Sequence, residues 1–220
     1  MNKPRFWILI LPFFLLTACI NYQQITVLKK DGSGEMFIHY WMQWKSAQDS
    51  ITISNMEIFQ IDSVNAEFST SFSQIEDVEV YEQKSDSSFH TKVELTFEKI
   101  DSLNSTEIFN LSKFSLIDGP NETKIFSQFV PPLATGFGLD KSPKQMEYVY
   151  YLPGKVLKHN ADEIDKNKLT WLFSSDKIGT GKFLSATITP FRLKETPMWV
   201  YYSAFFVIAV VLYFLFSKRK

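Results

Sequence analysis

The chain has 220 residues, of which 45% are hydrophobic, 21% charged and 16% aromatic. This is a globular composition, and it excludes a collagen-like or intrinsically disordered chain. Five of the 23 Lys and Arg residues lie in the two terminal segments, which leaves 18 Lys and Arg and 24 Asp and Glu in the rest of the chain, a net charge of −6. This negative charge excludes a nucleic-acid partner, because phosphates repel an acidic surface.

The first 18 residues have the pattern of a signal peptide. Lys3 and Arg5 precede an uncharged segment at 6–16, which is shorter than the ~20 residues that a membrane span needs. Leu16-Thr17-Ala18-Cys19 then matches the lipobox of bacterial lipoproteins, in which the Cys thiol accepts diacylglycerol before cleavage. The sequence therefore predicts cleavage of residues 1–18 and a mature N-terminus at Cys19 that carries fatty acids such as palmitate. Because Cys19 is the only cysteine, no disulfide forms within the chain.

A hairpin is predicted at the start of the mature chain. Segments 24–29 and 35–44 flank Lys-Asp-Gly-Ser-Gly at 30–34, whose glycines supply the positive φ of a tight turn. A calcium loop would need further oxygen ligands and a closing Glu, so turn chemistry is the better interpretation.

A partly helical segment is predicted at 55–75. Its apolar residues recur at intervals of three and four, the spacing of one helix face: Ile58, Ile61, Val64, Phe68 and Phe72.

A second hairpin is predicted at 76–98. Residues 76–82 and 89–98 alternate between apolar and polar side chains around a polar turn at 83–88. In the second strand one face carries Phe89, Val93, Leu95 and Phe97.

The rest of the outer segment predicts a short helix at 101–111 and further strands at 113–117, 124–130, 146–152, 168–173 and 183–191. The order of elements indicates one α+β domain over 19–197, with a mostly antiparallel sheet and a helix packed on one face.

Residues 198–216 predict one C-terminal transmembrane helix. They are uncharged and extend roughly 28 Å, close to the ~30 Å of a bilayer's hydrocarbon core. Trp199, Tyr201 and Tyr202 suit the membrane interface, and the basic tail at 217–220 favours the cytoplasmic side. We therefore expect a single-pass protein of the cytoplasmic membrane, with an extracytoplasmic domain and a cytoplasmic C-terminus.

Two stretches resemble the LppM-type family of bacterial lipoprotein domains. The first carries Val-Glu-Val-Tyr-Glu at 78–82, then Phe97, Leu103 and Phe-Ser-Leu at 114–116; the second carries Leu-Pro-Gly-Lys-Val at 152–156, Asn-Ala-Asp at 160–162, Asn167, Leu-Thr-Trp at 169–171 and Ala186. The resemblance covers about residues 19–190. It implies an α+β domain at the envelope with an affinity for lipids or glycolipids, and it brings no catalytic residues.

No catalytic or metal-binding pattern is found, so we expect neither an enzyme nor a metal or other cofactor. His39, His90 and His159 stand apart in the sequence, and none has a second ligand at the spacing of a metal site. No Gly-x-Ser-x-Gly elbow and no phosphate-binding loop is present.

An uncharged segment at 129–139 is the candidate lipid-contact loop. Its two prolines and two glycines disfavour a regular helix or a central strand. Such a loop either packs in the core or is exposed to a lipid or a partner. The residues proposed to contact lipid are Phe129, Val130, Leu133, Phe137 and Leu139.

Two functions are compatible with these features. The first is a membrane-anchored module that binds a lipid, a glycolipid or another amphiphile; the alternative is a non-enzymatic structural subunit that docks to an envelope protein complex. A deep apolar cavity would favour the first, and a solid core with a flat exposed patch would favour the second.

Overall fold

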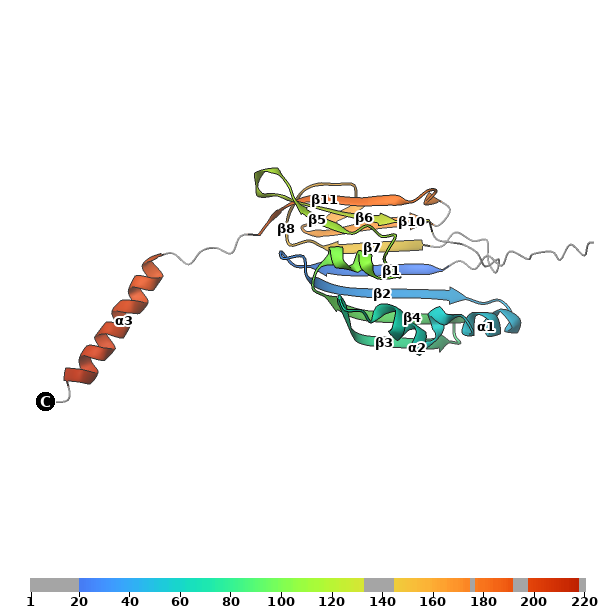
Figure 1. The fold of residues 1–220 in the computed structure, drawn as a ribbon, viewed down its shortest axis with the longest axis horizontal. Coiled ribbons are helices and arrows are strands. Elements are labelled where there is room, and N and C mark those ends of the chain that lie inside the picture. Colours follow the sequence, from blue (N-terminus) through green and yellow to red (C-terminus); the bar gives the residue numbers. More distant parts are fainter. Residues whose placement is uncertain (1–19, 133–144, 175–176, 192–197, 218–220) are drawn as a thin grey trace, which may run out of the picture. The chain divides into compact units, whose positions relative to one another are not determined.

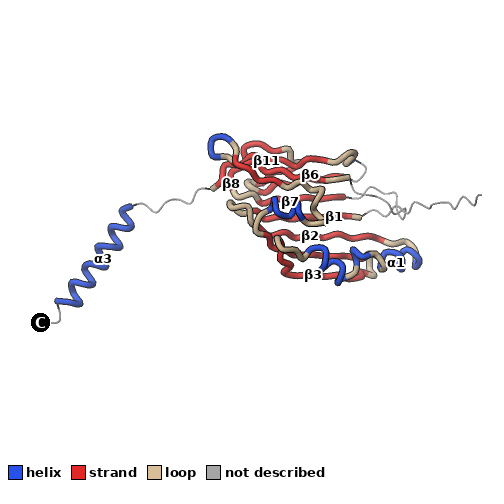
Figure 2. Tube along the Cα trace, in the orientation of Figure 1, coloured by secondary structure: helices blue, strands red, loops and turns tan. Residues whose placement is uncertain are grey.

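The computed structural model describes residues 20–132, 145–174, 177–191 and 198–217, and the chain divides into two units between Pro190 and Phe191. The first unit consists mostly of strands, with short helices between them (Figures 1 and 2). The second contains one helix. The fold is therefore α+β with more sheet than helix.

The larger sheet has seven strands in the order β3-β4-β2-β1-β7-β10-β9. Neighbours pair antiparallel except β1 and β7, which are parallel although more than 100 residues separate them. The strands are β1 (Asn21–Leu28), β2 (Gly34–Gln43), β3 (Ser73–Gln83), β4 (Ser88–Phe97), β7 (Gln145–Tyr151), β9 (Glu163–Asp165) and β10 (Lys168–Ser174).

A second sheet has four antiparallel strands in the order β5-β6-β11-β8. They are β5 (Ser115–Asp118), β6 (Lys124–Val130), β8 (Gly154–His159) and β11 (Lys182–Pro190). The sequence predicted a single sheet, and the second one corrects that expectation. Strand pairing between distant segments leaves no local pattern, so 113–117, 124–130 and 183–191 could be predicted as strands but not assigned to a sheet of their own.

Short helices follow the first hairpin. The capping box of Ser46 and Asp49 starts α1 (Ala47–Ser54), ahead of the predicted start at residue 55. η1 (Glu57–Phe59) and α2 (Ile61–Phe68) follow, and η2 (Ile100–Ser105) and η3 (Pro120–Glu122) are short 3₁₀ helices. The predicted helix at 55–75 ends early because Thr70 turns the chain into β3, its hydroxyl accepting from the backbone N–H groups of Phe72 and Ser73.

The helices and the second sheet pack on the same face of the seven-stranded sheet. On the β2–β4 side, Tyr40 Oη and Thr91 Oγ1 both donate to the Ile58 carbonyl, at 2.8 and 2.9 Å. On the β7–β10 side, the Phe126 ring of β6 lies 4.5 Å from that of Tyr150. One hydrophobic core runs between the layers, and its fully buried members include Ile38, Leu95, Leu103, Phe126, Tyr150, Leu169 and Trp171.

A buried polar network joins the two sheets within this core. Gln24 Nε2 donates to Tyr150 Oη at 2.8 Å, and Tyr150 Oη donates to Gln128 Oε1 of β6 at 2.5 Å. Burial raises the pKa of Tyr150, so the phenol stays neutral and can donate. Every buried polar side-chain atom in the described part of the chain has a hydrogen-bond partner. The network therefore fixes the alignment of the two sheets without leaving an unsatisfied group in the core.

The predicted hairpins are present with small shifts of their ends. Gly32 has φ +92° in the turn, as expected, whereas Gly34 belongs to β2 and is needed for close packing, since a Cβ there would lie 2.3 Å from the Val27 carbonyl oxygen.

The sequence analysis did not predict the strands β8 and β9. They are largely exposed edge strands, so the alternation that marks a half-buried strand is weak in them.

The second unit is α3 (Met198–Ser217). Its segment Met198–Phe216 has a mean hydropathy of 2.1, and none of it is buried. Among the described residues it is the one helix long and apolar enough to cross a membrane, which agrees with the predicted span at 198–216.

Candidate functional site

The predicted lipid-contact residues fall in two groups. Leu133, Phe137 and Leu139 lie outside the described residues, as does the predicted lipidation site Cys19. Val130 is 1% exposed and belongs to the core at the end of β6. Phe129, on the other side of that strand, is half-buried with its ring 4.9 Å from that of Phe183. Lipid contact through this loop stays a prediction.

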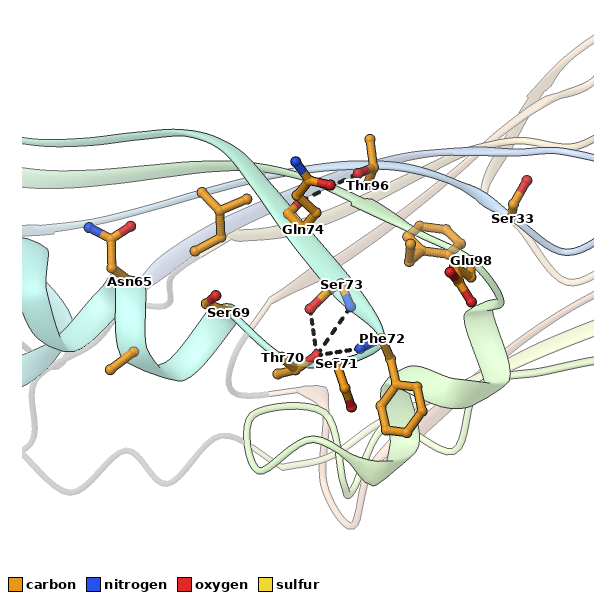
Figure 3. A pocket seen from close by; sticks show the side chains of 13 residues that line it. Ser33, Asn65, Ser69, Thr70, Ser71, Phe72, Ser73, Gln74, Thr96 and Glu98 are labelled. Atoms are coloured by element: carbon orange, nitrogen blue, oxygen red, sulfur yellow. Dashed lines mark hydrogen bonds between the residues drawn. The ribbon is translucent and has the colours of Figure 1, made fainter.

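A hollow of about 950 Å³ lies where α2 ends and β3 begins (Figure 3). Hydroxyl and amide side chains dominate its wall, with the half-exposed Phe72 beside them. The central hydroxyls bond to one another and to the backbone: Thr70 Oγ1 lies 2.8 Å from Ser73 Oγ, which donates to the Phe68 carbonyl at 2.8 Å. They therefore stabilise the turn into β3.

The face of the seven-stranded sheet opposite the helices is covered by no described element; we call it the open face. Cross-strand pairing places Asp77, Glu94, Phe37, Ile25 and Val149 in one row across five strands. The neighbouring rows run through Glu79, Lys92, His39, Gln23, Glu147 and Leu172, and through Thr96, Glu35, Val27, Tyr151 and Lys168.

The open face is partly apolar and exposed. Val27 is 41%, Tyr151 38% and Leu172 47% exposed, and Phe37 and Ile25 are half-buried beside them. Val149 and Thr170 of the same face are buried, at 4% and 6% exposed. A hollow of about 460 Å³ opens between Ile25, Val27 and Phe37, and three glutamates, Glu35, Glu76 and Glu94, also line it. Apolar residues of four neighbouring strands are thus gathered on a surface that a soluble monomer would normally cover with polar side chains.

At the β3 end of the open face, two of the histidines that stand apart in the sequence are in contact. His39 Nε2 lies 2.9 Å from His90 Nδ1, and Ser88 Oγ lies 2.6 Å from His90 Nε2 and donates to Asp86. The expectation of isolated histidines is therefore wrong for this pair. The pairing of β2 with β4 sets Trp41 opposite His90 and His39 two pairs further along on the same face, so spacing in the sequence could not reveal the contact.

The hydrogen bonds define the tautomers of this pair. Because the Ser88 proton goes to Asp86, His90 Nε2 donates to Ser88 Oγ and its Nδ1 accepts from His39 Nε2. Burial and the charges of His90 and Lys92 lower the pKa of His39 to about 4, and burial lowers that of His90 as well. Both imidazoles are therefore neutral at pH 7.

The pair does not extend to a larger ligand set. Within the described ranges no group of three or more His, Cys, Asp or Glu side chains is placed to hold a metal ion. Tyr81 and Trp41 lie on either side of His90 with nearly parallel rings, at centroid distances of 4.9 and 6.1 Å. Lys92 is held by Glu79 at 2.9 Å. The cluster therefore ties β2, β3 and β4 together at the open face through rings and hydrogen bonds.

One signal in the sequence pointed to the open face. In 35–44 the even positions, Met36, Ile38, Tyr40 and Met42, are apolar and buried, as the alternation of a half-buried strand requires. The odd positions Phe37, His39 and Trp41 are ring-bearing rather than charged. A strand with apolar or aromatic residues on both faces indicates that the second face also contacts something.

Comparison with known proteins leaves the family open. No protein-family model matches the chain, and no curated protein matches it. Among solved structures, the folded domain of LppM from Mycobacterium tuberculosis matches at 12% identity with a TM-score of 0.47. The match covers 82% of this chain and 95% of that domain. LppM represents the family whose motifs the sequence resembles, but a likeness at this level transfers no function.

Proposed function

We propose that this chain is a membrane-anchored lipoprotein whose extracytoplasmic domain is a non-enzymatic docking module for another protein of the cell envelope. The surface that docks is the open face of the seven-stranded sheet. The lipobox ending at Cys19 and the apolar helix α3 support two membrane attachments, and the basic tail at 217–220 supports a cytoplasmic C-terminus.

The observation that carries the proposal is the contrast between the two faces of one sheet. One face is packed against helices and a second sheet, whereas Val27, Tyr151 and Leu172 on the other face are between 38% and 47% exposed. Strand pairing holds these side chains in fixed positions, so a partner would meet a preformed surface and would lose little conformational freedom in binding it.

The described interior supports docking over lipid binding. A site for an acyl chain needs a deep apolar cavity, and burial of its surface would gain about 25 cal/mol per Å². The hollow beside α2 is lined largely by hydroxyl and amide groups, and the hollow on the open face is a surface depression with carboxylates around it. The core between the sheets is filled by large side chains such as Phe126, Tyr150 and Trp171.

Cysteine labelling in membranes tests this function. Cys19 is the only native cysteine, so the wild-type protein provides the blank. Leu172→Cys reports on the open face, and Ile51→Cys, 56% exposed on α1 on the helix side of the sheet, is the matched control. In spheroplasts an impermeant maleimide should label Ile51→Cys readily and Leu172→Cys slowly, and extraction into detergent should abolish the difference. Equal labelling of both in spheroplasts would contradict docking at this face, and no labelling of either would contradict an extracytoplasmic domain.

A further inference from the structure

The hollow on the open face combines an apolar floor with uncompensated negative charge. Ile25, Val27 and Phe37 come from β1 and β2, and Glu35, Glu76 and Glu94 come from three successive strands of the sheet, β2, β3 and β4. Strand pairing holds the carboxylates around the apolar side chains, since Phe37 lies opposite both Ile25 and Glu94.

The three carboxylates are not neutralised within the domain. The Glu94 carboxylate makes no hydrogen bond or ion pair with any described residue. Glu76 accepts only from the neutral Thr96 hydroxyl, at 3.1 Å. Glu35 lies 3.5 Å from Lys29 Nζ, but both side chains are more than half exposed, and such a pair contributes little. The hollow therefore keeps a negative field beside its apolar floor.

The same sign of charge extends across the open face. Lys92 and Lys168 are the lysines at its paired positions, and Lys92 is already bound to Glu79. The remaining charged positions in these rows are acidic: Asp77, Glu147, Glu163 and Asp165. A surface of this kind attracts cationic partners and repels anionic headgroups or an identical acidic face.

We infer that the hollow on the open face binds a protein segment in which an apolar side chain is flanked by Lys or Arg. The inference rests on the proposed docking function and specifies the partner's chemistry. The apolar side chain covers Val27 and Phe37, which lose their contact with water. The flanking cations lie against Glu35, Glu76 and Glu94, so charge sets the orientation and speeds the encounter while apolar burial holds the complex.

Photo-crosslinking of the full-length chain in its native membranes tests the inference. The crosslinker p-benzoylphenylalanine replaces Val27 at the edge of the hollow, and Ile51 on α1, on the helix side of the sheet, is the control position. We expect a protein adduct from position 27 and none from position 51. The adduct peptide, identified by mass spectrometry, should carry Lys or Arg on both sides of an apolar residue.

A charge test separates this inference from docking in general. Glu35→Gln, Glu76→Gln and Glu94→Gln together should weaken the adduct several-fold, as should raising the salt from about 0.05 M to about 0.5 M. Glu57→Gln, Glu67→Gln and Glu107→Gln form the matched control, because these glutamates, from η1, α2 and the turn after η2, lie near one another and do not line the hollow. All three carboxylates of the hollow are exposed, so their triple variant should keep the wild-type melting midpoint. The control variant removes the repulsion that helps raise the pKa of Glu67, so it should melt at or above that midpoint.

The outcomes distinguish the two levels of the proposal. An adduct that survives both the Gln variants and high salt would overturn the cationic partner and leave the docking function in place. A chain crosslinked to a second copy of itself would overturn the inference in favour of self-association. A lipid adduct, or no adduct at position 27, would overturn the docking function as well.

Discussion

His39 and His90 share a single hydrogen bond across neighbouring strands, with His39 Nε2 2.9 Å from His90 Nδ1. The bond requires one donor and one acceptor, so the two facing nitrogens cannot both carry a proton. Ser88 binds the remaining nitrogen of His90, and Lys92, Glu79, Asp86 and Tyr81 are the ionisable groups around the pair. Protonation of the pair at low pH therefore opposes the contact that joins β2 to β4.

This contact predicts a loss of stability in mild acid. The pKa of His39 falls from 6.5 in the unfolded chain to about 4 in the folded domain, and that of His90 is also lowered. Below pH 6.5 the unfolded chain therefore binds protons that the folded domain does not, so stability decreases as the pH falls from about 6.5 to about 4. The slope is at most about 1.4 kcal/mol per pH unit for each histidine, and less here because His39 is partly exposed.

This effect is measured by thermal melting of the wild type and two variants between about pH 7.5 and about pH 4, a range that includes the histidine pKa. Many carboxylates also titrate at its acid end, so the informative quantity is a difference between variants. The double variant His39→Gln, His90→Gln should show a shallower dependence than the wild type, and His159→Gln should match the wild type. Identical slopes for the wild type and the double variant would show that the pair does not control acid stability.

Trp171 predicts a large loss of stability on truncation. Its side chain is 1% exposed, its Nε1 donates to Asn160 Oδ1 at 2.9 Å, and its ring lies 6.0 Å from that of Tyr150. Trp171→Ala should lower the free energy of unfolding by about 3–5 kcal/mol, because it leaves a cavity in the core, although Asn160 Oδ1 keeps the bond that it accepts from the Ser185 N–H. Phe183→Ala, at a 58% exposed position, should cost about 0.5 kcal/mol or less. Chemical denaturation of both variants checks the contrast, and a near-neutral Trp171→Ala would mean that the indole is not in the core.

Alternation of apolar and polar residues predicted the strands that are half-buried and that pair with a neighbour nearby in the sequence. The alternation in 89–98 predicted β4, and its apolar positions Val93, Leu95 and Phe97 are buried at 4% or less. The second sheet and the parallel pairing of β1 with β7 depend on contacts between segments far apart in the chain. No residue pattern within β1 specifies β7 as its neighbour, so these features required the three-dimensional structure.

The candidate site was less accessible to prediction than the fold. The hollow depends on the register that sets Phe37 opposite Ile25 and Glu94, and the histidine contact joins residues 51 positions apart. The sequence did carry the composition of the open face, in the apolar and ring-bearing odd positions of β2. The sequence could not show that this face is left uncovered by the other described layers.

Cys19 predicts covalent lipidation of the mature chain. The thiol follows Leu-Thr-Ala, and no other cysteine is present to accept diacylglycerol in its place. Cells grown with labelled palmitate should yield a labelled wild-type protein and an unlabelled Cys19→Ser variant. The variant should also keep its uncleaved N-terminal segment and migrate more slowly in gels. Label of equal intensity in both proteins would refute the lipobox assignment.

The segment 129–139 carries the alternative function, lipid contact that is separable from stability, whereas the docking function predicts wild-type protein free of co-purifying lipid. A partly sheltered acyl chain of about 200 Å² would gain roughly 5 kcal/mol before the costs of ordering it, so affinity would be weak and the nearby membrane would supply the lipid. Phe137→Ser should then abolish lipid that co-purifies with the detergent-extracted protein and leave the melting midpoint unchanged. Val130→Ser is the control for a core position, because Val130 is 1% exposed, and it should lower the midpoint. Lipid-free wild-type protein, or a Phe137→Ser variant that melts early and retains lipid, would assign the segment to the core rather than to a binding site.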